Sequence, residues 1–186
     1  MIQRIHQPSD SSMYSLIFVA KGIFLGDANS LLSRFHDYNA ITVYVGDEKA
    51  AFTLHRGPIC QVSAFFKGLF DGYFKESSEK EVTLKEHMPE SFDQFLSFAY
   101  SGTLDYAPFR GLNEEKTWMA YGRLYVLADY LQVTELKHII TKELFAKIVR
   151  ARSGGRTACI TAGVIDYVYS NTVRQCGLRR LIVAQQ

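Results

Sequence analysis

The segment Phe52–Phe74 constrains this chain most, because within it the spacing of apolar residues changes from strand-like to helical. Phe52 and Leu54 alternate with more polar residues, as in a half-buried strand. Gly57 and Pro58 interrupt this pattern, since the residue before a proline is pushed out of the helical conformation. We therefore expect a tight turn at Gly57-Pro58 and a new element after it.

The new element is predicted to be a short helix with an aromatic face. Ser63 is a suitable N-cap, because its hydroxyl can accept a free backbone N–H of the first turn. Apolar side chains then recur at helical spacing and predict one buried face, formed by Phe65, Phe66, Leu69 and Phe70. Asp71-Gly72 is typical of a helix end, and Lys75–Lys80 is expected to be a charged loop.

A small sheet is expected around this segment. Ile41–Val45 alternates apolar and polar residues, and Gly46–Lys49 has the composition of a turn that leads back into Ala51–Leu54. These two runs predict a hairpin. Glu81–Leu84 predicts a third strand.

The next stretch predicts a helix that starts near Pro89, since proline is tolerated in a first helical turn. Its apolar stripe consists of Phe92, Phe95, Leu96, Ala99 and Tyr100. Gly102 is placed where a left-handed C-terminal cap is needed. Because a core needs only one stripe, we expect the side chain of Phe98 to be exposed and available for a contact.

Two further helices are predicted after a loop at Thr103–Thr117, with Thr117 as the cap of the first. The apolar stripe of this helix is Trp118, Tyr121, Leu124, Tyr125, Ala128 and Leu131. The second helix starts at Val133-Thr134 and places on one face Leu136, Ile139, Ile140, Leu144 and Ile148. A short turn between them predicts a helical hairpin that packs on the helix after Ser63.

Several motifs in this order resemble the BTB/POZ domain family. They are Phe-Thr-Leu-His-Arg at residues 52–56, Ser63-x-x-Phe66, Phe74-Lys75-Glu76, the Tyr-x-Gly-x-Leu ending at residues 100–104, and residues 124–136. The resemblance covers roughly residues 40–150. It implies an α+β fold in which a small three-stranded sheet flanks a cluster of five or more helices. It also implies a protein-interaction module rather than an enzyme.

Length and composition favour one domain with appendages, because 186 residues with 47% apolar and 22% charged residues are ordinary for a single globular unit. We expect an N-terminal arm at residues 1–38 that is partly disordered, the BTB/POZ domain at 39–150 and a C-terminal helical extension at 151–186. In the extension, one helical face carries Val164, Ile165, Val168 and Tyr169. This region, with Leu178-Arg179-Arg180-Leu181, resembles the tail of many fungal BTB proteins, which implies a fungal origin.

The N-terminal arm contains one apolar run, Tyr14–Leu25, which Lys21 interrupts. A membrane span needs about 20 apolar residues, so we expect a strand or arm that packs on the domain or on a partner. Some relatives exchange this region between subunits. The resemblance therefore implies self-association as a homodimer or hetero-oligomer through Leu16, Ile17, Phe18, Leu31, Leu32 and Phe35.

The resemblance also implies a specific partner, cullin-3. In cullin-binding relatives a hydrophobic-x-Glu triplet follows the third helix, and Leu112-Asn113-Glu114 has this form. With Phe98 these residues form the predicted cullin-type site of a ubiquitin ligase substrate adaptor, and the helical tail is expected to extend it. The family usually has an aspartate where this chain has Ala40, which speaks against the pocket that some dimeric repressors use. No zinc-finger, kelch or MATH unit is recognisable, so the arm or tail would capture the client.

Two alternatives to the adaptor remain. One is an oligomerising scaffold or transcription co-regulator that does not bind cullin. The other is a thiol enzyme built on Cys60 and His55, which needs a third orienting group that is not evident. The resemblance assigns His55 a structural role.

Charge and cysteine usage bound the partners and the compartment. A net charge of +2 is too small to imply nucleic acid or a membrane, and the cations Lys147, Arg150, Arg152 and Arg156 are interpreted as solvated. No histidine or cysteine pair has ligand spacing, so no metal or cofactor is expected. Three widely spaced cysteines fit reduced thiols in the cytoplasm or nucleus.

Overall fold

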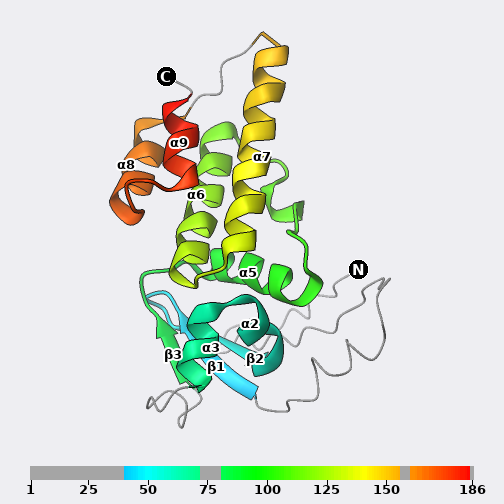
Figure 1. Ribbon diagram of the computed structural model, residues 1–186, viewed down its shortest axis with the longest axis vertical. Coiled ribbons are helices and arrows are strands. Elements are labelled where there is room, and N and C mark those ends of the chain that lie inside the picture. The colour runs from blue at the N-terminus through cyan, green and yellow to red at the C-terminus, as the bar shows by residue number, and fades with distance from the viewer. Residues whose placement is uncertain (1–39, 72–80, 156–159, 185–186) are drawn as a thin grey trace, which may run out of the picture.

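The computed structural model describes residues 40–71, 81–155 and 160–184. Within them the chain forms a three-stranded sheet, seven α-helices and one 3₁₀ helix. Figure 1 shows the sheet with α2 (Arg56–Val62) and α3 (Ala64–Asp71) at one end of the molecule, α5 (Pro89–Ser101) across the middle, and the hairpin of α6 (Glu114–Tyr130) and α7 (Thr134–Ser153) beyond it. The α+β class, the small sheet and the cluster of more than five helices are as predicted.

The sheet has the strand order β2-β1-β3. β1 (Ala40–Val45) pairs with β2 (Ala50–His55) in an antiparallel hairpin, and with β3 (Glu81–Leu84) in parallel. The predicted hairpin and third strand are therefore confirmed. Alternation buries one face of β1, because Ile41, Val43 and Val45 are all 2% exposed or less.

A helix replaces the tight turn predicted at Gly57-Pro58. α2 (Arg56–Val62) begins directly after β2 and contains both residues in its first turn. The first backbone N–H groups of a helix have no partner within the helix, so proline removes no hydrogen bond there. Glycine before the proline also lacks the Cβ that would crowd the ring. The predicted turn was wrong because a helix start satisfies the same restrictions.

The predicted aromatic helix is confirmed as α3 (Ala64–Asp71). Ser63 caps it, since its Oγ accepts the backbone N–H of Phe66 at 3.2 Å. Phe66 and Phe70 are buried, while Phe65 and Leu69 are half-buried and pack against the core. The face therefore lies inward, although it is not buried to the same depth throughout.

Aromatic rings join the sheet to the helices. α5 (Pro89–Ser101) places Phe92 against Phe52 of β2, with ring centroids 5.0 Å apart, and Phe95 against Phe66 of α3 at 6.1 Å. Phe92 and Phe95 also contact each other at 5.6 Å. Edge-to-face and offset pairs of this kind add to the stabilisation from burial. As predicted, α5 ends at a left-handed Gly102, whose φ is 73°.

The helical hairpin consists of α6 (Glu114–Tyr130) and α7 (Thr134–Ser153). The apolar stripe predicted for the first helix is buried at all six positions, the last of which is the C-cap of α6. The stripe predicted for α7 is buried at Leu136, Ile140, Leu144 and Ile148. α6 begins four residues earlier than expected, because Asn113 rather than Thr117 caps it: the side chain of Asn113 accepts the backbone N–H of Lys116 at 2.8 Å. Thr117 therefore lies inside the first turn, and its hydroxyl donates to the Asn113 carbonyl at 2.8 Å.

The C-terminal extension forms two helices, α8 (Ala162–Asn171) and α9 (Gly177–Val183), which pack on α6 and α7 respectively (Figure 1). Val164 and Val168 are buried as predicted, whereas Tyr169 is 41% exposed. Its ring instead lies 4.6 Å from the guanidinium of Arg179, an arrangement that holds an aromatic ring at the surface. α7 continues to Ser153, beyond residue 150, where the domain was predicted to end.

Gly122 lies on α6 where that helix faces α8. A Cβ at this position would lie 3.5 Å from Cγ2 of Val168, which is ordinary van der Waals contact. We expect Gly122→Ala to raise the free energy of unfolding by up to about 1 kcal/mol, because alanine favours helix. Gly122→Leu should instead lower it by about 1–3 kcal/mol through overpacking. Urea denaturation measures both.

Gly68 of α3 supplies the matched control for this prediction. It is exposed, and a Cβ there would meet nothing within 4 Å. Gly68→Leu should therefore be tolerated. If Gly122→Leu were as stable as Gly68→Leu, close packing of α8 on α6 would be contradicted.

The predicted arm at residues 1–38 and the whole of the predicted loop at Lys75–Lys80 lie outside the described residues. The apolar run Tyr14–Leu25 belongs to this part and so remains a prediction. In the part of the chain that is described, no helix has the length and apolar character needed to cross a bilayer.

Candidate partner-binding site

The loop between α5 and α6 is fixed by two contacts with the helical hairpin. The Tyr106 hydroxyl donates to Oε1 of Glu143 on α7 at 3.1 Å. Phe109, in the 3₁₀ helix Ala107–Phe109, stacks on Tyr121 of α6 with ring centroids 4.2 Å apart. Because both helices of the hairpin hold the loop, the residues that follow are presented in one place.

The residues presented are Leu112, Asn113 and Glu114, the triplet predicted as the cullin-type site. Leu112 is 38% exposed, and Asn113 and Glu114 are also exposed. Asn113 is occupied by capping α6, as described above, whereas Glu114 is the first residue of that helix. A carboxylate in the first turn is stabilised by the helix dipole. The site thus combines an exposed apolar side chain with an adjacent negative charge.

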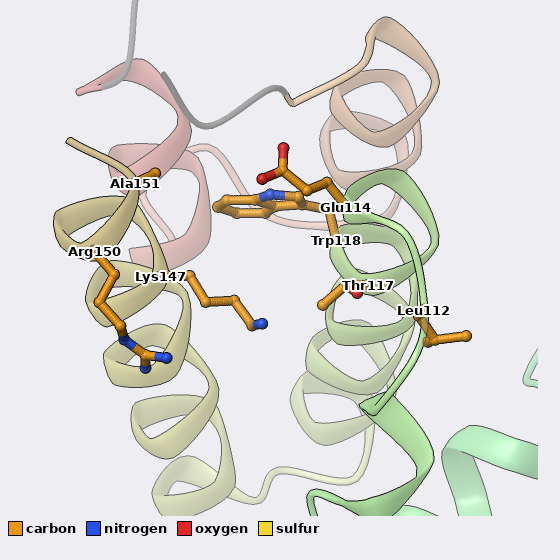
Figure 2. A pocket seen from close by; sticks show the side chains of 7 residues that line it. All are labelled: Leu112, Glu114, Thr117, Trp118, Lys147, Arg150 and Ala151. Atoms are coloured by element: carbon orange, nitrogen blue, oxygen red, sulfur yellow. The ribbon is translucent and has the colours of Figure 1, made fainter. Parts of the chain in front are cut away.

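A notch of about 210 Å³ lies beside this triplet, between the start of α6 and the end of α7. It is lined by Leu112, Glu114, Thr117, Trp118, Lys147, Arg150 and Ala151. Figure 2 shows Lys147 reaching from α7 toward α6, the ring of Trp118 between the two helices, and Leu112 pointing away from α7. Its size suits one or two side chains of a partner rather than a large ligand.

The two walls of the notch carry opposite charges. Glu114 lies on the α6 side, and Lys147 and Arg150 lie on the α7 side (Figure 2). Among the residues that the structure describes, Glu114 forms no ion pair with either cation. Burial raises the pKa of nearby Tyr121 to about 12, and the Glu143 carboxylate acts in the same direction, so this hydroxyl is neutral at physiological pH. The Lys147 ammonium lies 6.0 Å from the centroid of this ring, and no carboxylate of the described residues forms an ion pair with Lys147 or Arg150.

Phe98 does not belong to this surface. It was predicted to be exposed, but it is 2% exposed in the structure. α5 lies between two layers, with α2 on one side and α6 on the other, so it buries more than one stripe of side chains. The assumption that a single stripe fills the core was wrong for this helix, and Phe98 is a core residue.

Sequence reasoning missed Trp118, Lys147 and Arg150 as parts of the site. Trp118 was assigned to the core, where it is 4% exposed, and the two cations were interpreted as solvated. The signal was present in the predicted hairpin, because antiparallel helices bring the start of the first beside the end of the second. Lys147 and Arg150 are three residues apart and so share one face at that end.

His55 and Cys60, the residues of the thiol-enzyme alternative, have structural neighbours. The His55 backbone N–H donates to the Tyr100 hydroxyl at 3.0 Å, and Nδ1 of His55 lies 3.2 Å from the same oxygen. Burial lowers the pKa of Arg56, but hydrogen bonds to Asp71 and Cys60 outweigh it and leave the pKa raised. The contacts of His55 with Tyr100 and of Cys60 with Arg56 thus help to join β2 and α2 to the rest of the fold.

Among the described residues, neither metal ligands nor the residues predicted for self-association contribute to this site. Within residues 40–71, 81–155 and 160–184, no cluster of three or more histidine, cysteine or acidic side chains could hold a metal ion. The residues predicted for self-association all lie outside those ranges, and their role remains a prediction: Leu16, Ile17, Phe18, Leu31, Leu32 and Phe35.

A three-stranded sheet packed on a helical cluster, with an exposed apolar and acidic helix start, defines an α+β interaction domain. A sequence model of the BTB/POZ domain family matches residues 30–148. This match covers more than half of the chain, which therefore belongs to the BTB/POZ domain family. Domains of this family mediate protein–protein interactions.

The similar proteins cover different shares of the chain. Trishanku of Dictyostelium discoideum is 38% identical over 84 residues, which are 45% of this chain but only 11% of that protein. Among solved structures, the BTB domain of zebrafish PATZ1 is 18% identical with a TM-score of 0.45, covering 63% of this chain and 85% of that one. The BTB domain of human gigaxonin is 17% identical with a TM-score of 0.44, covering 67% and 98%.

Proposed function

We propose that this protein is a self-associating BTB/POZ module that docks a partner protein at the start of α6, with cullin-3 as the partner. The observation that carries the proposal is Leu112, 38% exposed, two residues before the exposed carboxylate of Glu114. The hydrophobic-x-Glu triplet of cullin-binding relatives combines the same two chemistries. The role is that of a substrate adaptor in a ubiquitin ligase complex.

The surroundings of Leu112 support a docking role. The loop contacts of Tyr106 and Phe109 hold the apolar side chain in place before binding, which lowers the entropy lost on association. The neighbouring notch can receive a side chain, and the indole of Trp118 forms part of its lining. A partner that fills the notch would also meet the cations of α7.

The proposal is tested by binding the purified amino-terminal domain of cullin-3 to the full chain by titration calorimetry. Glu114→Arg reverses the charge beside Leu112, and we expect affinity to fall by about tenfold or more. Leu112→Ala removes the exposed apolar contact, and a loss of about fivefold or more is expected if it is an anchor of the interface.

Glu135→Arg is the matched control. Glu135 is also an exposed acid in the first turn of a helix, α7, so the cost of placing a cation near the helix N-terminus is the same, about 0.3–1 kcal/mol. Its affinity should equal that of the unchanged protein. Equal binding by Glu114→Arg would place the cullin site elsewhere, and no binding by the unchanged protein would refute the cullin proposal.

The alternative is a nuclear or cytoplasmic scaffold or transcription co-regulator that oligomerises without cullin. It is favoured if the unchanged chain self-associates but does not bind cullin-3. Solution mass across concentration measures self-association, and deletion of residues 1–38 should reduce it if the arm supplies the contact. The thiol enzyme stays a distinct alternative, tested by the rate at which Cys60 reacts with an iodoacetamide probe at neutral pH.

A further inference from the structure

A second, larger concavity lies between α7 and the C-terminal extension. It is a groove of about 940 Å³, with one wall from α7 and the other from α9 and the segment before it. Phe145 is 57% exposed on the α7 wall and Val173 is 66% exposed on the opposite wall. Exposed apolar side chains on both sides of one groove mark a surface that binds another molecule.

The groove also carries an excess of positive charge. Asp129 and Lys137 neutralise each other through an ion pair of 2.7 Å. Lys142 and Arg180 remain, one on each wall, and no carboxylate of the described chain pairs with either. Within the ranges that the structure covers, the guanidinium of Arg180 makes one hydrogen bond, a long one to the Gln175 carbonyl at 3.4 Å. A ligand of the groove must therefore combine apolar groups with negative charge.

We propose that this groove binds an acidic amphipathic helix of a partner protein. Two helical walls with an apolar floor form the kind of surface that receives a helix, whose apolar face enters while its edges meet the rims. Leu181 and Cys176, each 8% exposed, contribute to that floor. Glutamates on both edges of the incoming helix would face Lys142 and Arg180. The groove shares no lining residue with the notch beside Leu112, so its test can fail without the cullin proposal failing.

Other occupants fit the groove less well. Two copies related by a two-fold axis would present the same cations to each other, which is unfavourable. The apolar run Tyr14–Leu25 of the chain's own arm contains Lys21 and no acidic residue, so it lacks the complementary charge. A lipid surface would need an exposed convex or flat face rather than a concavity between two helices.

Two synthetic helical peptides test the proposal by fluorescence anisotropy with the full chain. Both carry the same leucine stripe, but one has glutamates and the other lysines along the edges of the stripe. The acidic peptide should bind more tightly, and added salt should weaken it. The double variant Lys142→Glu/Arg180→Glu should bind the acidic peptide about tenfold more weakly and prefer the basic one. Phe145→Ala, made without the charge substitutions, should also weaken binding of the acidic peptide.

Lys67→Glu/Lys85→Glu is the control, since both lysines are exposed and lie outside the groove. It makes the same change in net charge and should leave the preference for the acidic peptide intact, as should Glu114→Arg. Circular dichroism verifies that each variant is folded. Binding of neither peptide, equal binding of both, or the same loss in the control would overturn the proposal. If the protein sedimented with anionic phosphatidylserine vesicles and bound neither peptide, the proposal would be overturned in favour of a membrane surface.

Discussion

Phe66→Ala is expected to lower the free energy of unfolding by about 3–5 kcal/mol, a large part of the 5–15 kcal/mol typical of a domain. Phe66 is 0% exposed, and its ring lies 5.3 Å from Phe65 and 6.1 Å from both Phe70 and Phe95. Alanine would leave a cavity at the point where α3 meets α5. Urea denaturation at a fixed protein concentration measures the loss, because self-association makes apparent stability depend on concentration.

Phe145→Ala is the control for this experiment, since Phe145 is 57% exposed on α7. The same side chain is removed, but little area is withdrawn from water in the folded state. The free energy of unfolding should change by less than about 0.5–1 kcal/mol. If Phe66→Ala were no more destabilising than Phe145→Ala, the aromatic cluster would not be the centre of the fold.

The strands and long helices were predictable because their burial is one-sided and therefore periodic. β1 alternates strictly, and α6 repeats apolar residues at helical spacing along one face. α2 was missed because it is short and its identity depends on backbone groups at a helix start, which leave no periodic signal. The start of α6 was misplaced for a similar reason, since both Asn113 and Thr117 are suitable caps in the sequence.

The site was predictable only where local sequence determines exposure. Leu112 and Glu114 lie in a polar loop, and the structure leaves both exposed. The prediction that Phe98 is exposed was wrong because its burial depends on α6, which packs on α5 from a distant part of the chain. The groove between α7 and α9 was not predicted at all, since it exists only once the extension packs on the hairpin. Tertiary packing, rather than propensity, decides these surfaces.

Ser63→Ala is expected to have the next largest effect, about 1–3 kcal/mol of unfolding free energy, although it removes one oxygen atom. Ser63 is 1% exposed, and its hydroxyl donates to the Leu131 carbonyl at the end of α6 at 2.6 Å. The same oxygen accepts the Phe66 N–H at the start of α3, as described above. Alanine would leave a buried donor and a buried acceptor without these partners, where water cannot replace them.

Ser101→Ala tests whether burial is the cause of this effect. The Ser101 hydroxyl also donates and accepts: its oxygen lies 2.6 Å from the Ser97 carbonyl and 2.9 Å from the Thr103 carbonyl, either of which its single proton can reach, and it accepts the Thr103 N–H at 3.1 Å, but it is exposed. Water can take its place, so the change should stay within about 0.5 kcal/mol. In Ser63→Ala, amide hydrogen exchange should also quicken at Phe66, because the cap of α3 is lost. Equal stability of the two variants would show that the link between α3 and α6 depends on apolar packing alone.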